Sequence, residues 1–238
     1  MVLNFAHRGS LTEAPENTLS SIKKAVAHKA KGIELDVQLT KDNHLVVIHD
    51  HRFKRFNKNY GLVQAYTLAE IKQIDVGSSF SKEFAGEPLA TLAEILEIVP
   101  RNTILNIEIK NIPVIYPGIE ETLIHCLAEH DRMDHILISS FDHVALKKVQ
   151  ELDPDIPIGM LFYYRLLEPW KYAKNSGLRV ASIHPNVVYT DKAFIAACHR
   201  YGYKVFPFTV NRMSQYRKLV EWGVDGVFSN NPEIFTQS

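Results

Sequence analysis

Short runs of apolar residues alternate along the chain with segments in which apolar residues recur every three or four positions. The short runs are nearly continuous and rich in β-branched residues, and they predict β-strands. They lie at residues 2–6, 32–37, 45–49, 103–109, 135–139, 156–162, 180–184, 204–210 and 226–229. The periodic segments predict helices at residues 17–30, 92–99, 118–129, 143–152, 165–175, 192–201 and 213–222. This alternation is typical of a parallel sheet covered by helices.

The nine predicted strands are one more than an eight-stranded α/β barrel needs. The extra strand is the one at 45–49, because only seven residues separate it from the strand at 32–37. A parallel crossover normally takes about a dozen residues or more. We expect either a hairpin of 45–49 with the preceding strand or an extended crossover that replaces one helix. Both alternatives leave an α/β fold of the (β/α)8 TIM-barrel type as the predicted architecture.

Residues 51–90 interrupt the alternation of strands and helices. They contain the basic stretch HRFKRFNKNYG, the short helix-like LAEIKQI and the polar GSSFSKEFAGEP. We expect a small insertion here that forms a wall of the active site. The chain length of 238 residues fits a single barrel domain over residues 1–238 that includes this insertion.

Composition and charge narrow the classes of partner. The 27 basic and 27 acidic residues cancel, so an anionic ligand must be attracted by a local site, and nucleic acid is not expected. Cys126 and Cys198 lack CxxC spacing and are expected to be small apolar residues rather than a disulfide or zinc site. The chain has neither a signal-like start nor a run of eighteen apolar residues. We therefore expect a cytoplasmic protein without stable membrane insertion.

Acidic side chains interrupt two of the predicted strands. In GIELDV, Glu34 and Asp36 are separated by one residue, so both carboxylates point to the same face of the strand. In LNIEIK, Glu108 and Lys110 share a face in the same way. Three carboxylates and one ammonium leave an excess of negative charge, and such oxygen ligands suit Mg²⁺ or Ca²⁺. An internal salt-bridge network, for example between Glu34 and Lys110, is the alternative interpretation.

Two histidines stand at the ends of predicted strands. His7 ends the first strand and is followed by Arg8, and His49 ends LVVIH. Taken singly, each would be interpreted as part of a polar loop. The carboxyl ends of barrel strands, however, meet at the face where barrel enzymes have their active sites. Polar side chains at the ends of four strands therefore predict one catalytic site.

The segments HRGSLTEAPENTLSSIKKAV, GIELDVQLTKDNHLVVIHD and NIEIK together resemble the glycerophosphodiester phosphodiesterase family. The resemblance continues through EFAGEPLATLAEIL, ISSF, FTVN and GVDGVFSNNP, and so extends over essentially the whole chain. It implies a TIM barrel with a small insertion and one divalent cation, Mg²⁺ or Ca²⁺. The implied reaction is the hydrolysis of a small-molecule glycerophosphodiester to an alcohol and sn-glycerol 3-phosphate.

The resemblance also implies roles for individual residues. Three carboxylates match the family's metal ligands, two histidines match its general acid and base, and two cations match its phosphate contacts. In that order, these residues are Glu34, Asp36 and Glu108, then His7 and His49, then Arg8 and Lys110. The sequence does not decide which histidine is the acid, nor whether water or the glycerol 2-hydroxyl is the nucleophile.

The part of the pocket that holds the rest of the substrate departs from the family pattern. Phe208 and Asn211 in FTVN are expected to contact the glycerol moiety, with core packing as the alternative for Phe208. The family often has Trp where Phe208 stands, Asp where Asn230 stands and Trp where Ser79 stands. These departures leave the predicted chemistry intact and concern the head-group pocket.

Several other residues have a structural interpretation as well as a functional one. Asn17 is expected to cap the first helix, with a contact to the ligand site as the alternative. His184 is expected to pack in the core or to line the pocket. The basic run at 51–55 is expected to be solvated surface, with attraction of anionic substrates as the alternative. Tyr163 and Tyr164 face the same end of the predicted barrel, as pocket or lid.

Two other functions are compatible with the sequence. The first is a related metal-dependent barrel that hydrolyses lysophospholipids or polyglycerophosphate fragments. The second is a catalytically silent barrel that binds glycerol phosphates; it would be indicated by the loss of a ligand or a histidine, and this chain has lost none. The alcohol preference, the identity of the metal and the oligomeric state do not follow from the sequence.

Overall fold

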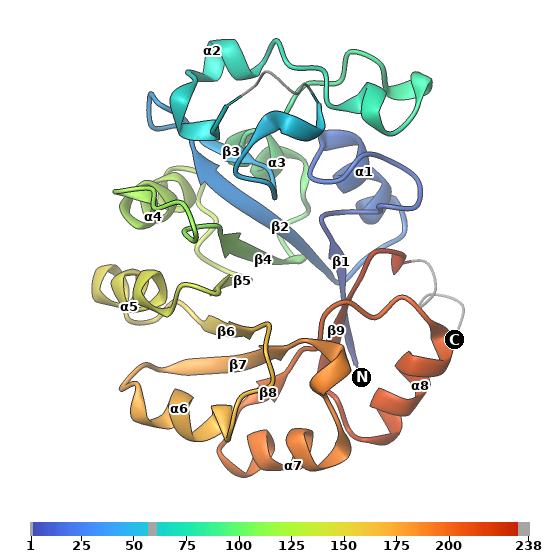
Figure 1. Cartoon of the computed structure of the whole chain (residues 1–238), viewed down its shortest axis with the longest axis vertical. Coiled ribbons are helices and arrows are strands. Elements are labelled where there is room, and N and C mark those ends of the chain that lie inside the picture. The colour runs from blue at the N-terminus through green and yellow to red at the C-terminus, as the bar shows by residue number, and fades with distance from the viewer. Residues whose placement is uncertain (1, 57–60, 233–238) are drawn as a thin grey trace.

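The computed structural model describes residues 2–56 and 61–232. Within them, eight parallel strands form a nearly closed barrel with helices on its outside (Figure 1). The barrel strands are β1 (Leu3–His7), β2 (Gly32–Leu39), β4 (Ile104–Ile109), β5 (Ile136–Ser140), β6 (Ile158–Phe162), β7 (Val180–Pro185), β8 (Lys204–Val205) and β9 (Gly226–Ser229). The outer helices are α1 (Leu19–Ala27), α3 (Leu92–Ile98), α4 (Ile119–Glu129), α5 (His143–Leu152), α6 (Pro169–Asn175), α7 (Lys192–Arg200) and α8 (Met213–Glu221). The predicted TIM barrel is confirmed.

The extra strand, β3 (Leu45–Val47), pairs antiparallel with β2, so that Val37 lies opposite Val47. The hairpin is therefore the correct one of the two alternatives, and β3 adds no strand to the barrel. The predicted strand at 204–210 is shorter than expected, because β8 ends before Pro207, which lacks the N–H that a ladder needs. The barrel closes beyond this point through the hydrogen bond from Phe228 N to Pro207 O, at 3.0 Å.

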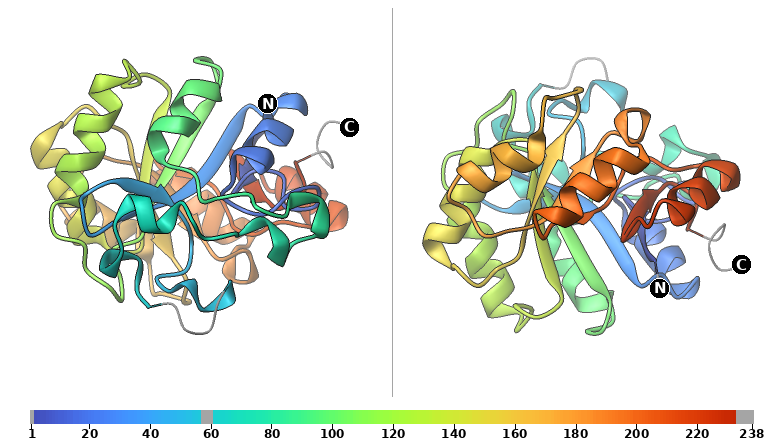
Figure 2. Two further views of the ribbon diagram at one scale, coloured as in Figure 1. Left: turned by 90° about the horizontal axis from the view of Figure 1, so that it is seen from above. Right: turned by 90° about the horizontal axis from the view of Figure 1, so that it is seen from below.

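The stretch at 51–90 is a chain of short helical turns around α2 (Leu68–Ile71), and it gathers on one side of the barrel near β3 (Figure 2). The turns are η1 (Phe53–Arg55), η2 (Val63–Ala65), η3 (Gly77–Ser79) and η4 (Lys82–Phe84). Apolar side chains of this stretch form a small core with Val46 and Ile48 that is separate from the main core. The described part of the stretch thus has the form expected of an insertion, while the single-domain boundary at 1–238 stays a prediction.

The inside of the barrel is filled at its amino-terminal end by aromatic side chains. The Phe5 ring lies 4.8 Å from the Phe228 ring and 5.4 Å from the Phe206 ring, measured between centroids. These rings and Leu137 are all buried. Barrel interiors are packed in such layers, so polar side chains that point inward can reach a cavity only at the carboxyl end of the strands.

The first helix does not have the predicted cap. The side chain of Thr18, not that of Asn17, accepts a hydrogen bond from the Ser21 backbone N–H, and the Ser21 hydroxyl accepts one in return from the Thr18 N–H. This reciprocal arrangement is a capping box. Asn17 instead has a positive φ of 58°, a conformation that asparagine tolerates better than most residues, and its side chain faces the barrel.

Among the described residues, no helix is both long enough and apolar enough to cross a membrane. Cys198 is buried, Cys126 is partly buried, and both are free thiols.

Candidate active site

A cavity of about 480 Å³ opens at the carboxyl ends of the barrel strands. One part of its wall carries charged and polar side chains, namely those of His7, Arg8, Glu34, His49, Asn106, Glu108, Lys110 and Ser139. Another part is mainly apolar and includes Phe141, Leu161, Tyr163, Val187, Val188 and Phe208. We call this space the catalytic cavity. Seven of the nine predicted site residues line this cavity, and Asp36 and Asn211 do not.

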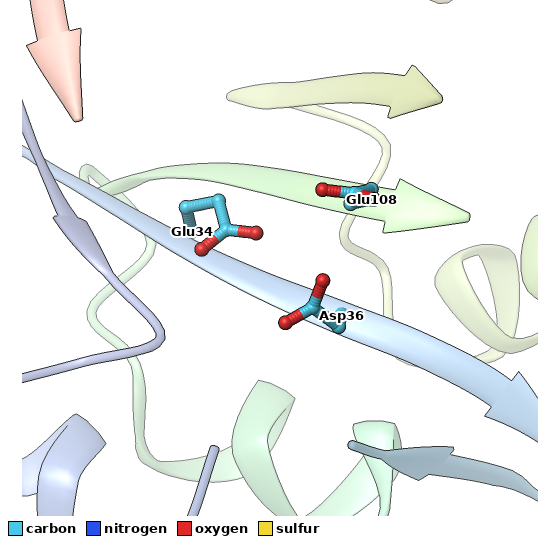
Figure 3. Close-up of side chains that lie close together, drawn as sticks. All are labelled: Glu34, Asp36 and Glu108. Atoms are coloured by element: carbon cyan, nitrogen blue, oxygen red, sulfur yellow. The ribbon is translucent and has the colours of Figure 1, made fainter. Parts of the chain in front are cut away.

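The three predicted metal ligands converge beneath the catalytic cavity. Glu34 and Asp36 come from β2 and Glu108 comes from β4, and their side chains point toward one another (Figure 3). Asp36 and Glu108 are register partners on the two adjacent strands. One carboxylate oxygen from each residue lies within 4.8 Å of the others, and all three residues are buried. This cluster could hold a metal ion.

Burial and mutual repulsion disturb the titration of these acids. Burial, followed by the charges of Asp36 and Glu108, raises the pKa of Glu34 well above its usual value. Burial also raises the pKa of Glu108. Burial alone would raise the pKa of Asp36 too, but the adjacent charges of Arg8 and Lys110 hold it below its usual range. Without a further cation, the cluster therefore disfavours full ionisation.

Several oxygens in this cluster have no hydrogen-bond donor among the described residues. They are Glu34 Oε1, Asp36 Oδ1 and Asn106 Oδ1, all of them buried. Leaving such oxygens unpartnered is costly, especially when they carry charge. Carboxylate and amide oxygens are the ligands that Mg²⁺ and Ca²⁺ prefer. The donor set therefore fits a hard divalent cation, and Asn106 is a candidate ligand in addition to the three predicted acids.

The two predicted phosphate-binding cations contact the same acids. Arg8 donates its backbone N–H to Glu34 Oε2 at 2.9 Å, and its Nε lies 3.3 Å from Asp36 Oδ2. Lys110 Nζ lies 2.7 Å from Glu108 Oε1 and 3.7 Å from Asp36 Oδ1. Lys110 thus pairs with Glu108 and Asp36 rather than with Glu34, the pair that the salt-bridge interpretation named.

Gly9 allows the chain to turn away directly after Arg8. Its φ is +86°, and a Cβ atom there would lie 2.5 Å from the Ser21 hydroxyl oxygen. Only glycine tolerates both this conformation and this close approach. The HRG sequence therefore brings the backbone N–H and the side chain of Arg8 to the acids while α1 packs directly against the turn.

His7 occupies a buried place beside the acids. Its Nδ1 lies 2.6 Å from Asn230 Oδ1, and its Nε2 lies 3.9 Å from Glu34 Oε2. Burial, followed by the charge of Arg8, lowers the pKa of His7 to about 4. At neutral pH the imidazole is therefore neutral. Because an amide oxygen can only accept, the proton is assigned to Nδ1, which leaves the Nε2 lone pair free on the cavity side.

His49 has a different partner. Its Nδ1 lies 2.9 Å from the Asp50 carboxylate, and the side chain is about a third exposed, at 33%. The hydrogen bond with His49, together with the nearby charge of Arg55, lowers the pKa of Asp50 to about 2. The motif HD therefore places a permanent negative charge next to His49, whereas His7 faces a neutral amide. Asp50 contacts a predicted catalytic histidine, although no role was predicted for it from the sequence.

The insertion reaches this site through Arg55. The Arg55 Nη2 atom lies 2.7 Å from Glu16 Oε1 and 3.0 Å from Asp50 Oδ2. Glu16 also pairs with Arg8, at 3.3 Å. Arg55 is exposed, which agrees with the interpretation of residues 51–55 as solvated surface, but its ion pairs also connect it to the site. Spacing in the sequence could not have revealed this contact, because the two partners of Arg55 come from separate loops.

The insertion does not line the catalytic cavity itself within the described residues. Arg52, Lys54 and Arg55 instead line an adjoining cleft of about 650 Å³, which shares His49 and Lys110 with the cavity wall. The insertion is thus a wall of the neighbouring space and acts on the site through ion pairs.

Two asparagines support the site from behind. Asn17 is buried and donates its side-chain N–H to Asp36 Oδ2 at 2.9 Å, so the alternative of a contact to the ligand site is the correct one. Asn211 lies outside the cavity wall, and its side-chain oxygen accepts the backbone N–H of Asn230 at 3.0 Å. Asn211 therefore positions the partner of His7, and its predicted contact with glycerol stays a prediction.

The aromatic residues divide between cavity and core. Phe208 lines the cavity, and its ring packs edge-on against Phe141 with 5.8 Å between centroids. Tyr163 lines the cavity, whereas Tyr164 faces a neighbouring groove. His184 is fully buried, its Nε2 lies 2.7 Å from Ser182 Oγ, and it does not line the cavity. For His184, core packing is the correct alternative.

Comparisons with known proteins agree on one family. The family described as "Glycerophosphoryl diester phosphodiesterase family" matches residues 7–234. A glycerophosphodiester phosphodiesterase from Caldanaerobacter subterraneus subsp. tengcongensis is 42% identical over 232 residues, which cover 97% of this chain and 95% of that protein. A glycerophosphodiester phosphodiesterase from Bacillus altitudinis is 37% identical, with 96% of this chain and 94% of that protein covered.

A solved structure shows the same similarity in three dimensions. A phosphodiesterase from Oleispira antarctica, in complex with the product sn-glycerol-3-phosphate, has a TM-score of 0.90 and 33% sequence identity to this chain. The match covers 99% of this chain and 95% of that one.

Proposed function

The chain belongs to the glycerophosphoryl diester phosphodiesterase family, and from this premise we propose how its site works. The protein is a glycerophosphodiester phosphodiesterase. We propose that it releases an alcohol and sn-glycerol 3-phosphate and depends on one divalent cation, Mg²⁺ or Ca²⁺. The observation that carries this proposal is the buried acid cluster, whose unpartnered oxygens lie at the floor of the catalytic cavity.

Glu34, Asp36 and Glu108 are the proposed metal ligands. They come from two adjacent strands, so the sheet itself holds them at a fixed separation. These three carboxylates would hold a divalent cation, which would supply Lewis-acid charge for the phosphodiester and a template for its oxygens. Asn17 orients the Asp36 carboxylate by its hydrogen bond to Oδ2, which leaves Oδ1 to face the cluster.

Arg8 and Lys110 are the proposed phosphate contacts. Both cations line the cavity and are already held near the acids, so they need little reorganisation to meet an anion. The fork of Arg8 suits two phosphate oxygens, and Lys110 adds a point charge. Their existing ion pairs position them, and a bound phosphodiester would share them with the acids.

The environments of the two histidines divide the acid and base roles. His7 is neutral at physiological pH, with its Nε2 lone pair free, and is therefore proposed as the general base that takes a proton from the nucleophile. His49 instead contacts the ionised Asp50, with 2.9 Å between Nδ1 and Oδ1. It is proposed as the general acid that gives its proton to the leaving alcohol oxygen. Either water or the glycerol 2-hydroxyl would serve as nucleophile with these same groups.

A substrate panel tests this function. Purified protein is incubated with glycerophosphocholine, glycerophosphoethanolamine and bis-glycerophosphate, and release of sn-glycerol 3-phosphate is measured with and without a chelator. We expect turnover that the chelator abolishes and that Mg²⁺ or Ca²⁺ restores. Turnover that is indifferent to the chelator would contradict the metal role, and binding of glycerol 3-phosphate without any turnover would favour the silent barrel. Cytoplasmic location and the lack of nucleic-acid partners stay predictions.

A further inference from the structure

Large apolar side chains are exposed together on two neighbouring loops at the mouth of the catalytic cavity. The loops follow β6 and β7, which pair in the barrel. Leu167 is 96% exposed, Val188 is 76% exposed and Tyr164 is 74% exposed. We call the set the apolar rim; it consists of Tyr163, Tyr164, Leu166, Leu167, Val188 and Tyr189. Single exposed apolar residues are common on protein surfaces, whereas a cluster of six such residues indicates a binding surface.

Behind the rim lies a groove of about 420 Å³. It runs between the loop after β6 and the first turns of α6 and α7. Much of its wall is apolar and includes Phe162, Tyr164, Leu166, Leu167, Trp170 and Phe194. Among the described residues, its charged lining side chains, two basic and two acidic, balance one another: Arg165, Arg200, Glu168 and Asp191. The groove carries none of the predicted catalytic residues, so the reaction proposed above leaves it without a role.

The groove and the catalytic cavity are neighbours. Asn186 lines both, and consecutive residues alternate between them: Tyr163 faces the cavity and Tyr164 faces the groove. These two tyrosine rings pack edge-on with 5.3 Å between centroids. Val188 and Tyr189 are divided in the same way. The ridge between the two spaces is therefore itself apolar, and an alkyl chain can cross it without desolvating a charge.

The cleft on the insertion side of the cavity differs from the groove in net charge. Within the described part of the chain, the cleft near His49 is lined by the single acid Asp50 and by four basic residues, Arg52, Lys54, Arg55 and Lys110. The site thus offers a positively charged exit on the insertion side and an apolar exit with balanced charges on the side of the β6 and β7 loops. A substrate with a polar end and an apolar end matches this difference.

We propose that the catalytic cavity and the groove together bind a glycerophosphodiester that carries one acyl chain, a lysophospholipid, with its acyl chain laid over the apolar rim into the groove. This binding mode rests on the proposed function, because the same acids and histidines would act on the phosphodiester. In the net reaction a water oxygen becomes bonded to phosphorus, the bond from phosphorus to the head-group oxygen breaks, and the alcohol leaves with a proton from that water. The other product is a monoacylglycerol phosphate.

An acyl chain explains the rim better than a protein partner does. A protein seated on these loops would cover the mouth of the catalytic cavity and exclude substrate. An acyl chain enters together with the group that is hydrolysed. The groove shares Asn186 with the cavity, so an acyl chain that lies in it is continuous with the group that is hydrolysed.

The test uses short-chain lysophosphatidylcholines that stay monomeric in water. Choline release is measured for glycerophosphocholine and for the hexanoyl, octanoyl and decanoyl compounds, all below their micelle concentrations. A methylene in an open groove should gain about half of the free energy of complete burial. This gain corresponds to about a twofold rise in kcat/KM for each methylene. The decanoyl compound has four more methylenes than the hexanoyl compound, so we expect roughly a sixteenfold rise between them.

Variants locate the effect. The double variant Leu166→Ser, Leu167→Ser should flatten the dependence on chain length, measured as the ratio of decanoyl to glycerophosphocholine turnover within the same preparation. Because the ratio is internal, a general loss of folded protein cancels. Leu152→Ser is the matched control, since Leu152 is 44% exposed at the far end of α5. It should keep the full ratio.

The outcomes separate this inference from the proposed function. Hydrolysis of glycerophosphocholine with no preference for acylated compounds would overturn the acyl groove and leave the proposed function standing. A lack of turnover of every compound, with metal supplied, would overturn the proposed function as well. Activity that rises only above the micelle concentration would also overturn the groove, because it would indicate docking of the rim on a lipid surface.

Discussion

The inside of the barrel contains two regions built from the same kind of strand with opposite chemistry. Between β2 and β4, inward side chains are carboxylates that converge under a cavity. Between β1, β9 and the segment after β8, inward side chains are phenylalanine rings that pack on one another. Both regions are buried. Burial at the barrel axis is common to both regions and therefore does not distinguish the candidate site. The distinguishing property is the unbalanced negative charge at the carboxyl ends of β2 and β4.

Two histidines sharpen the contrast, because His7 lies beside the acids and His184 lies against the phenylalanine rings. Burial is the largest cause of a lowered pKa in both, to about 4 for His7 and to about 3 for His184. The value alone does not distinguish them. His7 lines the cavity and lies beside Glu34, whereas His184 lies between the rings of Phe206 and Phe228. Contacts therefore separate the site histidine from the core histidine.

The largest effect is expected when charge is removed from the acid cluster. Glu34→Gln keeps the shape and can still accept the Arg8 N–H, but it removes a charged metal ligand. We expect kcat/KM to fall by about 10³ or more, equivalent to several kcal/mol of lost transition-state stabilisation. Calorimetric titration with Mg²⁺ and Ca²⁺ should show weaker binding in the same variant.

Glu120→Gln is the matched control for this prediction. Glu120 is also a buried glutamate, but it lies on α4 and pairs with Lys148 at 3.3 Å. Its replacement should leave metal binding and turnover unchanged. If Glu34→Gln retained both as well, the acid cluster would be a salt-bridge network, as the alternative interpretation states.

The sequence could predict this cluster because the rule involved is local. Glu34 and Asp36 are two positions apart on one strand, and the two-residue period of a strand puts them on one face without knowledge of the rest of the fold. The contribution of Asn17, Glu16 and Arg55 could not be predicted in this way. These residues meet the site from separate loops, and their positions follow from the packing of the whole chain.

Local conformation explains the other differences. Asn17 was expected to cap a helix because asparagine favours that position, yet its positive φ turns the side chain toward Asp36. Pro207 ends β8 early within an apolar run that otherwise indicates a longer strand. In both cases the pattern of residue types was correct for the element, and a single backbone property moved its boundary.

The second largest effect separates the two histidine environments. His7→Ala and His49→Ala should each lower kcat by about 10² or more, the usual contribution of an acid or base group. Metal binding should persist in both, because neither removes a carboxylate of the cluster. His184→Leu should keep kcat within about twofold, since His184 lies outside the cavity. Single-turnover measurements with saturating metal would check all three, and near-normal turnover in His7→Ala would remove it from the catalytic site.

A smaller effect is expected from the residue that orients the cluster. Asn17→Ala removes the hydrogen bond to Asp36 Oδ2 but leaves every proposed ligand in place. Loss of a group that orients a metal ligand typically weakens metal binding by about 10- to 100-fold. We therefore expect a higher metal concentration for half-maximal activity, with kcat largely restored at saturation. Thr18→Ala serves as the control, because Thr18 is the adjacent buried residue and caps α1 without touching an acid. An equal metal requirement in the two variants would contradict the orienting role of Asn17.

The smallest effect concerns stability rather than catalysis, and it isolates the core histidine. The unfolded chain binds a proton on His184 as the pH falls below the ordinary value of 6.5, whereas the folded chain resists that proton until the pH is about 3. The free energy of unfolding must therefore fall as the pH falls through this window, and for one such group the loss is about 2 kcal/mol between about pH 7.5 and about pH 5. His184→Leu removes this titrating group. Over the same pH range, the free energy of unfolding of the variant should therefore fall by about 2 kcal/mol less than that of the natural protein. The unpaired Ser182 hydroxyl lowers the stability of the variant equally at every pH and does not affect this comparison. Urea unfolding of both proteins at about pH 7.5 and about pH 5 gives the change in the free energy of unfolding for each protein. The same change in both proteins would mean that His184 gains its proton within the folded core.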